Sequence, residues 1–216
     1  MPSKYKDIVD CYSKGSRVRL HKMLDLCTSL HAFVYGIEIS QNGEKVARCC
    51  IPACEVDCFS IRLNRNSHQR QIPNGILYAF EKKMGSLNFR RSFHNFDDFF
   101  EYVAANCGLK NGHCLLVYDF CLRKGQHMSP KIEPIEYVYL FQGAKKGAEN
   151  VIGKFNSYKL PIKLLQDALD TYLSSMEIED LLCVCKEHLK YIGPITAKKR
   201  QALFKKHNVL LLNVNK

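Results

Sequence analysis

The sequence predicts an α+β protein in which a mostly antiparallel sheet packs against helices and is followed by a helical C-terminal part. Apolar and polar residues alternate in short stretches before residue 64, which is typical of half-buried strands. From residue 160 onward the apolar residues recur at three- and four-residue spacings, which is typical of helices. A chain of 216 residues can hold a main domain and a smaller one. We expect an α+β domain over 1–142 and a helical subdomain with a basic last helix over 143–216.

The N-terminal third is predicted to begin with helix and continue as a meander of three antiparallel strands. A helical turn is expected around residues 4–12 and an amphipathic helix over 17–30. Three strands should then follow, with turn residues at 41–43: 31–39, 44–51 and 57–64. The polar composition of residues 64–75 indicates a loop.

The middle of the chain holds the clearest local signal, a helix that begins after Asn95. Asn95 is a good N-cap, acidic residues occupy the first turn, phenylalanines share one stripe, and Gly108 should end the helix. A shorter helix is expected over 76–84. The apolar runs 113–121 and 135–142 have the length of strands and should complete the sheet.

The C-terminal part is predicted to be a loop followed by three helices. The loop covers residues 143–150, and the first helix covers 160–174. A capping box formed by Ser174 and Glu177 should open the second helix, which runs through Tyr191 to a Gly-Pro stop. Thr196 should cap the third helix, which ends near His207, and residues 209–214 resemble a strand.

The composition favours a folded protein of the cytoplasm or nucleus. The sequence has no run of eighteen apolar residues, no signal-peptide pattern at its start and no N-glycosylation sequon. Its eleven cysteines are an odd number in a long chain, which favours reduced thiols over a disulfide framework. Most of them, such as Cys27, Cys107 and Cys121, should pack as small apolar side chains.

The net charge of +11 is concentrated in two segments. Residues 59–95 hold seven basic residues and one acidic residue, and residues 190–216 hold seven basic residues and no acidic one. The rest of the chain therefore has a net charge of −2. Clustered positive charge attracts a polyanion, so these two segments favour nucleic acid as the partner.

The basic segments supply the candidate binding residues. Along the last predicted helix, two pairs of lysines form adjacent lines on one face. In the first segment, arginines and His68 alternate with loop residues and, near Phe89 and Phe93, suit stacking on the bases of RNA or single strands. The proposed contacts are Arg62, Arg65, Arg70, Arg90, Arg91, Lys198, Lys199, Lys205 and Lys206.

Metal and nucleotide sites are weaker interpretations of the sequence. Four cysteines between 49 and 58, or Cys183 and Cys185 with His188, do not have the paired spacing of a structural zinc site. Residues 147–154 depart from the phosphate-binding loop pattern in glycine spacing and in the residue after the lysine. We expect no metal ion and no cofactor.

The sequence therefore favours a non-enzymatic nucleic-acid-binding protein with a preference for RNA or single strands. One alternative is a metal-dependent nuclease in which Glu38, Asp57 and Asp119 converge at strand ends, with His94 or His113 carrying a proton. A second alternative is a virus-encoded structural or adaptor protein whose basic face meets an acidic protein or an anionic membrane surface.

Overall fold

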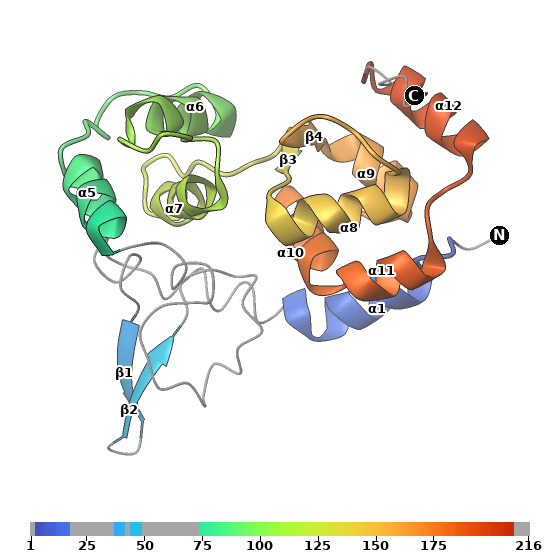
Figure 1. Cartoon of the computed structure of the whole chain (residues 1–216), viewed down its shortest axis with the longest axis horizontal. Helices are drawn as coiled ribbons and strands as arrows, with labels where there is room; N and C mark the ends of the chain where they lie inside the picture. Colours follow the sequence, from blue (N-terminus) through green and yellow to red (C-terminus); the bar gives the residue numbers. More distant parts are fainter. Residues whose placement is uncertain (1–2, 18–36, 42–43, 49–73, 210–216) are drawn as a thin grey trace. The chain divides into compact units, whose positions relative to one another are not determined.

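The computed structural model describes residues 3–17, 37–41, 44–48 and 74–209, which form two compact units (Figure 1). We call residues 1–18 together with 134–216 the terminal unit, and residues 19–133 the inserted unit. The sequence predicts a boundary between 142 and 143, whereas the units divide between 133 and 134. The terminal unit is built from both ends of the chain.

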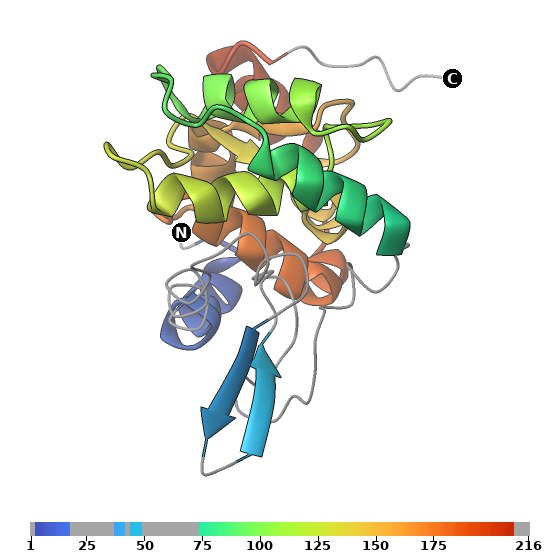
Figure 2. The same ribbon diagram turned by 90° about the vertical axis from the view of Figure 1, so that its left-hand side faces the viewer.

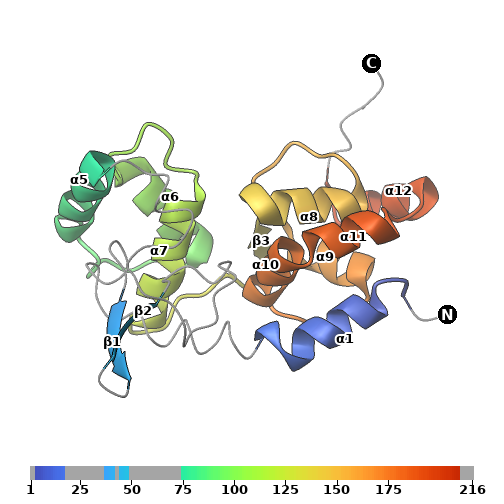
Figure 3. The same cartoon turned by 60° about the horizontal axis from the view of Figure 1, so that its bottom comes forward.

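The described part of the chain is mostly helical, with two small antiparallel ladders. This agrees with the α+β prediction in broad terms, but the predicted large sheet is wrong. The elements of the terminal unit (Figure 3) are α1 Lys6–Lys14, β3 Tyr137–Tyr139, α8 Gln142–Ile152, β4 Lys159–Pro161, α9 Ile162–Leu169, α10 Ser175–Val184, α11 Lys186–Ile192 and α12 Ala197–Lys206.

The centre of the terminal unit is the crossing of α8 and α10, where two glycines of α8 allow close approach. A Cβ atom on Gly147 would lie 1.9 Å from the carbonyl oxygen of Leu182 in α10. A Cβ atom on Gly143, one turn earlier, would lie 2.7 Å from the Sγ atom of Cys183. Small residues at i and i+4 therefore let the two backbones pack directly against each other.

The short ladder of β3 and β4 holds the start of α10 in place. Its register pairs Tyr137 with Pro161 and Val138 with Leu160. The hydroxyl of Ser175, the first residue of α10, donates a hydrogen bond to the carbonyl of Tyr137. The ladder thus links the entry into α8 with the beginning of α10.

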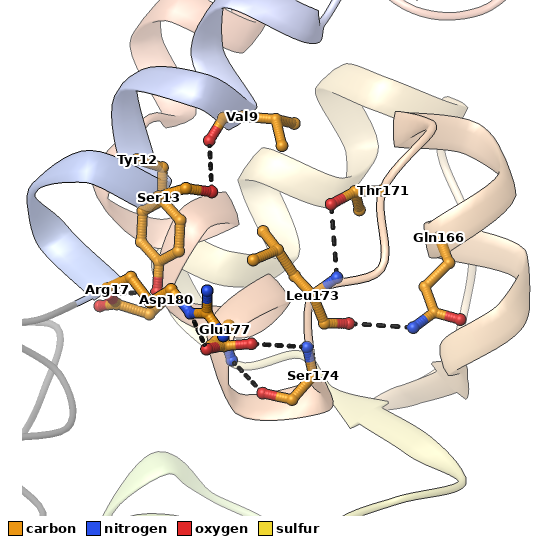
Figure 4. Close-up of polar contacts among 10 residues, drawn as sticks. All are labelled: Val9, Tyr12, Ser13, Arg17, Gln166, Thr171, Leu173, Ser174, Glu177 and Asp180. Atoms are coloured by element: carbon orange, nitrogen blue, oxygen red, sulfur yellow. Dashed lines mark hydrogen bonds and ion pairs between the residues drawn. The ribbon is translucent and has the colours of Figure 1, made fainter.

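Buried polar contacts attach the N-terminal helix to α10 (Figure 4). The Tyr12 hydroxyl donates a 2.9 Å hydrogen bond to the Asp180 carboxylate, and both residues are buried. Burial and the charge of Asp180 raise the pKa of Tyr12 far above its usual range, so the hydroxyl stays protonated and donates. Arg17 pairs with the carboxylate of Glu177, which also completes the cap of α10 with Ser174.

In its described residues, the inserted unit has a hairpin and three helices. The strands β1 Ile37–Gln41 and β2 Glu44–Arg48 (Figure 2) pair antiparallel, with Gln41 opposite Glu44, which confirms the expected antiparallel pairing of the first two strands of the meander. Its helices are α5 Asn74–Gly85, α6 Phe96–Asn106 and α7 Leu115–Gln126.

Aromatic side chains join the three helices of the inserted unit. Phe80 of α5 meets Phe120 of α7 with ring centroids 5.7 Å apart. Phe96 of α6 meets Tyr118 of α7 with centroids 6.0 Å apart. The thiols of Cys107 and Cys121 are buried in this unit, as predicted for small apolar side chains.

The predicted helix starts are confirmed at three caps. The side chain of Asn95 accepts a hydrogen bond from the Asp98 amide at 2.9 Å. Ser174 and Glu177 form the complete capping box, and Thr196 accepts from the Lys199 amide at 3.3 Å. These caps depend on contacts within one helical turn, which is why the local sequence reveals them.

Several other predictions are wrong. The run 113–121, predicted as a strand, forms most of α7, and the run 135–142 is a strand only at Tyr137–Tyr139. Residues 143–150, predicted as a loop, belong to α8, because their glycines and alanines pack against α10. The helix expected from 174 to 191 is two helices that meet at Cys185.

Five predicted elements lie wholly or mostly outside the described residues: the helix 17–30, the strand 31–39, the strand 57–64, the loop 64–75 and the strand 209–214. Cys27 and the cysteines between 49 and 58 lie there too. None of the helices in the described ranges has both the length and the apolar composition needed to cross a membrane.

Candidate nucleic-acid interface

The last helix, α12, has one packed side and one basic side. Leu203 and Phe204 are buried and attach the helix to the terminal unit. At about 100° per residue, Lys198 and Lys205 lie opposite this buried pair, and Lys199 lies on the flank. All three lysines are exposed, and none makes an ion pair among the described residues. These lysines are thus exposed as expected, and their binding of nucleic acid stays a prediction.

The N-terminus of α12 has a charge pattern that opposes the helix dipole. Its first turn contains Lys198 and Lys199 and no acidic residue. The partial positive charge of a helix N-terminus favours negative groups, and its first amides have no intrahelical acceptor. Thr196 satisfies the Lys199 amide, and the first intrahelical bond runs from the Arg200 amide to the Thr196 carbonyl. An external anion would stabilise this end of the helix.

Contacts from distant segments fix the turn that precedes α12, residues 193–196. The Ile195 amide donates to the Val151 carbonyl at 2.8 Å. The Tyr5 hydroxyl donates to the Gly193 carbonyl at 2.8 Å, and burial raises the pKa of Tyr5 to about 12, which keeps this proton in place. Gly193 itself has φ of +77°, which ends α11 in a conformation that glycine adopts readily.

Lys4 adds a further positive charge to this turn. Its Nζ atom donates to the carbonyls of Gly193 and Pro194 at 2.8 and 2.6 Å. The side chain is exposed, so the ammonium group still faces solvent. The turn therefore carries a cation from the opposite end of the sequence.

Arg200 connects α12 to the end of α8. Its guanidinium group lies over the ring of Phe204, 5.1 Å from the centroid, and donates a hydrogen bond to the Lys154 carbonyl. Lys154 is exposed and directly follows Gly153, which ends α8. The Lys154 backbone is thereby held against the side of α12 that carries Arg200.

The other end of α12 is partly neutralised. Lys206 pairs with Asp167 of α9 at 2.7 Å, and the ring of His207 contacts the same carboxylate at 2.9 Å. Hydrogen bonds from Lys206 and His207 lower the pKa of Asp167. Of the four predicted lysines, Lys206 thus already forms an ion pair with a carboxylate of the same unit.

The predicted arginines are only partly described. Arg62, Arg65, Arg70 and His68 lie outside the described residues. Arg90 and Arg91 are exposed in the segment between α5 and α6 of the inserted unit. The proposal that these arginines form one surface with the lysines of α12 stays a prediction.

Arg91 and its aromatic neighbours already contact one another. The Arg91 guanidinium lies 4.9 Å from the ring centroid of Phe93 and 4.6 Å from that of Tyr102. It also lies 3.9 Å from the Asp98 carboxylate. Phe93 packs on Phe99, with centroids 5.0 Å apart. The rings of Phe93 and Tyr102 are therefore already in contact with other side chains of the inserted unit.

Of the acidic residues of the nuclease alternative, Asp119 has a different environment from the one expected. Asp119 lies within α7 and is buried, so its expected position at a strand end is wrong. Glu38 belongs to β1, and Asp57 lies outside the described residues. The His113 ring contacts Glu101 at 2.8 Å, and the His94 amide donates to Asp98.

The structure also shows where several residues of the rejected metal and nucleotide motifs lie. In the terminal unit Cys183 is buried against α8 and His188 is exposed on α11; no group of metal-binding side chains occurs within the described residues. Residues 147–152 of the rejected phosphate loop are part of helix α8.

Sequence reasoning missed Lys4, Lys154 and the exposed Tyr191. Lys4 lies 189 positions from Gly193, and no periodicity or motif relates the two. Their proximity follows from the packing of the N-terminal segment on the terminal unit.

No protein family model, curated protein or solved structure matches the chain.

Proposed function

We propose that the terminal unit binds nucleic acid, and that the turn 193–196 and α12 form the contact with the phosphate backbone. The observation that carries the proposal is the N-terminus of α12, where Lys198 and Lys199 stand in place of the acids that a helix dipole favours. A phosphate at this position would be bound by the helix dipole, by free amides and by lysine side chains.

The arrangement of the cations supports a polyanion rather than a single small anion. Lys4 adds positive charge at the turn, and Lys205 continues the charge along the exposed side of α12. A helix of ten residues is about 15 Å long, so Lys198 and Lys205 are separated by about 10 Å along the axis. Successive phosphates of one strand can contact cations at such separations.

The proposed activity is binding without catalysis, with RNA or a single strand as the favoured ligand. Phosphate contacts alone would not select between strands or sequences. Any selection must come from groups that contact bases.

The direct test is fluorescence anisotropy with labelled single-stranded RNA, single-stranded DNA and duplex at several salt concentrations. Each phosphate contact on a single strand contributes about 0.7 to the slope of log affinity against log salt. Replacing Lys198 and Lys199 with glutamate should lower that slope by about 1.4 and the affinity at 0.1 M salt by about 25-fold.

The control is the Lys146→Glu, Lys163→Glu double variant, which makes the same charge change at exposed positions of α8 and α9 in the same unit. It should retain most of the affinity. Equal losses in the two double variants would mean that only net charge matters, and would refute a site at α12. Lys206 is left unchanged, because its replacement by glutamate would place two carboxylates together at Asp167.

A further inference from the structure

Between α1 and α11 lies a mainly apolar surface cavity that is open to solvent. The two helices lie alongside each other (Figures 1 and 3). The cavity has a volume of about 430 Å³ and is lined by Ile8 of α1 and by Glu187, His188, Tyr191 and Ile192 of α11. This is within the usual range for sites that bind small organic groups.

Tyr191 gives this cavity an aromatic wall that nothing in the described protein covers. The side chain is 95% exposed, although tyrosine is a residue that usually buries much of its ring. It belongs to the last turn of α11, two residues before Gly193. An exposed ring next to a basic turn is the arrangement that stacks on bases in single-strand binding proteins.

Lys4 places a cation at the turn that directly follows two cavity residues, Tyr191 and Ile192. Its ammonium group contacts the carbonyls of Gly193 and Pro194, and Ile8 of the cavity lies four residues further along the same segment as Lys4. A strand bound at the cavity would therefore meet this cation before it reaches α12.

We propose that Tyr191 and this cavity bind one nucleobase of a single strand whose backbone passes the Lys4 cation and continues toward α12. This inference depends on the function proposed above and adds the class of ligand. The base would stack on the Tyr191 ring and contact Ile8 and Ile192.

The charges around the cavity favour a base there and a phosphate outside it. The Glu187 carboxylate repels a phosphate but accepts hydrogen bonds from amino groups of bases, as carboxylates do with cytosine. The cations lie instead at the turn and on α12. Bases in a duplex are stacked and paired, so only an unpaired base can present its face to Tyr191.

The test compares Tyr191→Ala with Tyr191→Phe and with Tyr172→Ala. Tyr172 is 99% exposed in the segment between α9 and α10, so it provides a matched loss of an exposed ring. Alanine at 191 should lower the affinity for a single strand about 10-fold, since stacking contributes roughly 1–3 kcal/mol per base. It should leave duplex affinity and the salt slope unchanged. Phenylalanine at 191 and alanine at 172 should bind as the wild type does.

Three results would overturn the inference. Equal weakening of single-strand and duplex binding would mean that Tyr191 does not contact a base. An unchanged single-strand affinity in Tyr191→Ala, together with a loss in the Lys198→Glu, Lys199→Glu variant, would remove the base site and leave the phosphate site standing. A wild-type protein that binds no nucleic acid would remove both.

Discussion

The replacement Gly147→Ala tests the close crossing of α8 and α10 on which the terminal unit depends. The added methyl group would lie 1.9 Å from the Leu182 carbonyl oxygen and 2.7 Å from its carbon. The obstacle is backbone, which cannot rotate away as a side chain can, so the helices must separate by about 1 Å or more. Overpacking of a core costs about 1–3 kcal/mol, and a backbone clash belongs at the upper end of that range.

Helix propensity works in the opposite direction, because alanine is better than glycine inside a helix by about 1 kcal/mol. The net loss in the free energy of unfolding should therefore be about 2 kcal/mol. For a chain of 216 residues this lowers the melting temperature by about 4–8 °C. Circular dichroism or calorimetry measures the shift.

The matched control is Gly85→Ala at the end of α5, where an added Cβ atom has no neighbour within 4 Å. That variant should be as stable as the wild type or slightly more stable. If Gly147→Ala were also as stable as the wild type, propensity would outweigh packing and the described helix crossing would be incorrect.

Two further predictions concern buried and surface contacts. Tyr12→Phe removes the hydrogen bond to the Asp180 carboxylate and should lower the free energy of unfolding by about 1.5–3 kcal/mol, as measured by urea denaturation. A loss below about 0.5 kcal/mol would contradict the buried hydrogen bond between these two residues. Asp167→Asn should lower the melting temperature at neutral pH, because Lys206 and His207 lower the pKa of Asp167 in the folded state. A carboxyl group whose pKa is lower in the folded state than in the unfolded state, where it is near 3.8, stabilises the folded protein above that pH. This stabilisation is lost as the pH falls through the folded-state pKa. The difference between variant and wild type should thus shrink as the pH falls below about 4, and a difference that persists at low pH would exclude this ionic contact as its cause.

The errors of the sequence analysis have a common physical origin in α7 and α8. Every residue of α7 from Leu115 to Arg123 is buried, because α5 and α6 pack around it. A helix that is covered on all sides shows a continuous apolar run without helical periodicity, so the run resembles a buried strand. In α8 the glycines that suggested a loop are the residues that permit contact with α10.

The candidate site was predictable where it depends on one helix. The basic side of α12 follows from the spacing of its lysines, and its beginning follows from Thr196. The involvement of Lys206 with Asp167 was not predictable, because those residues are 39 positions apart and belong to different helices. The same limit applies to the place of Tyr191 beside Ile8, which results from the packing of α1 against α11.

By itself, the sequence determined the features that lie within one turn of a helix: the caps at Asn95, Ser174 and Thr196, and the concentration of positive charge near the C-terminus. Only the tertiary structure decided which distant segments complete that region, bringing Lys4 and Tyr5 to Gly193 and α1 to α10. The physical reason is the separation along the chain over which each interaction acts. Capping and dipole effects act between neighbouring residues, whereas hydrogen bonds and burial across the chain depend on how whole helices pack.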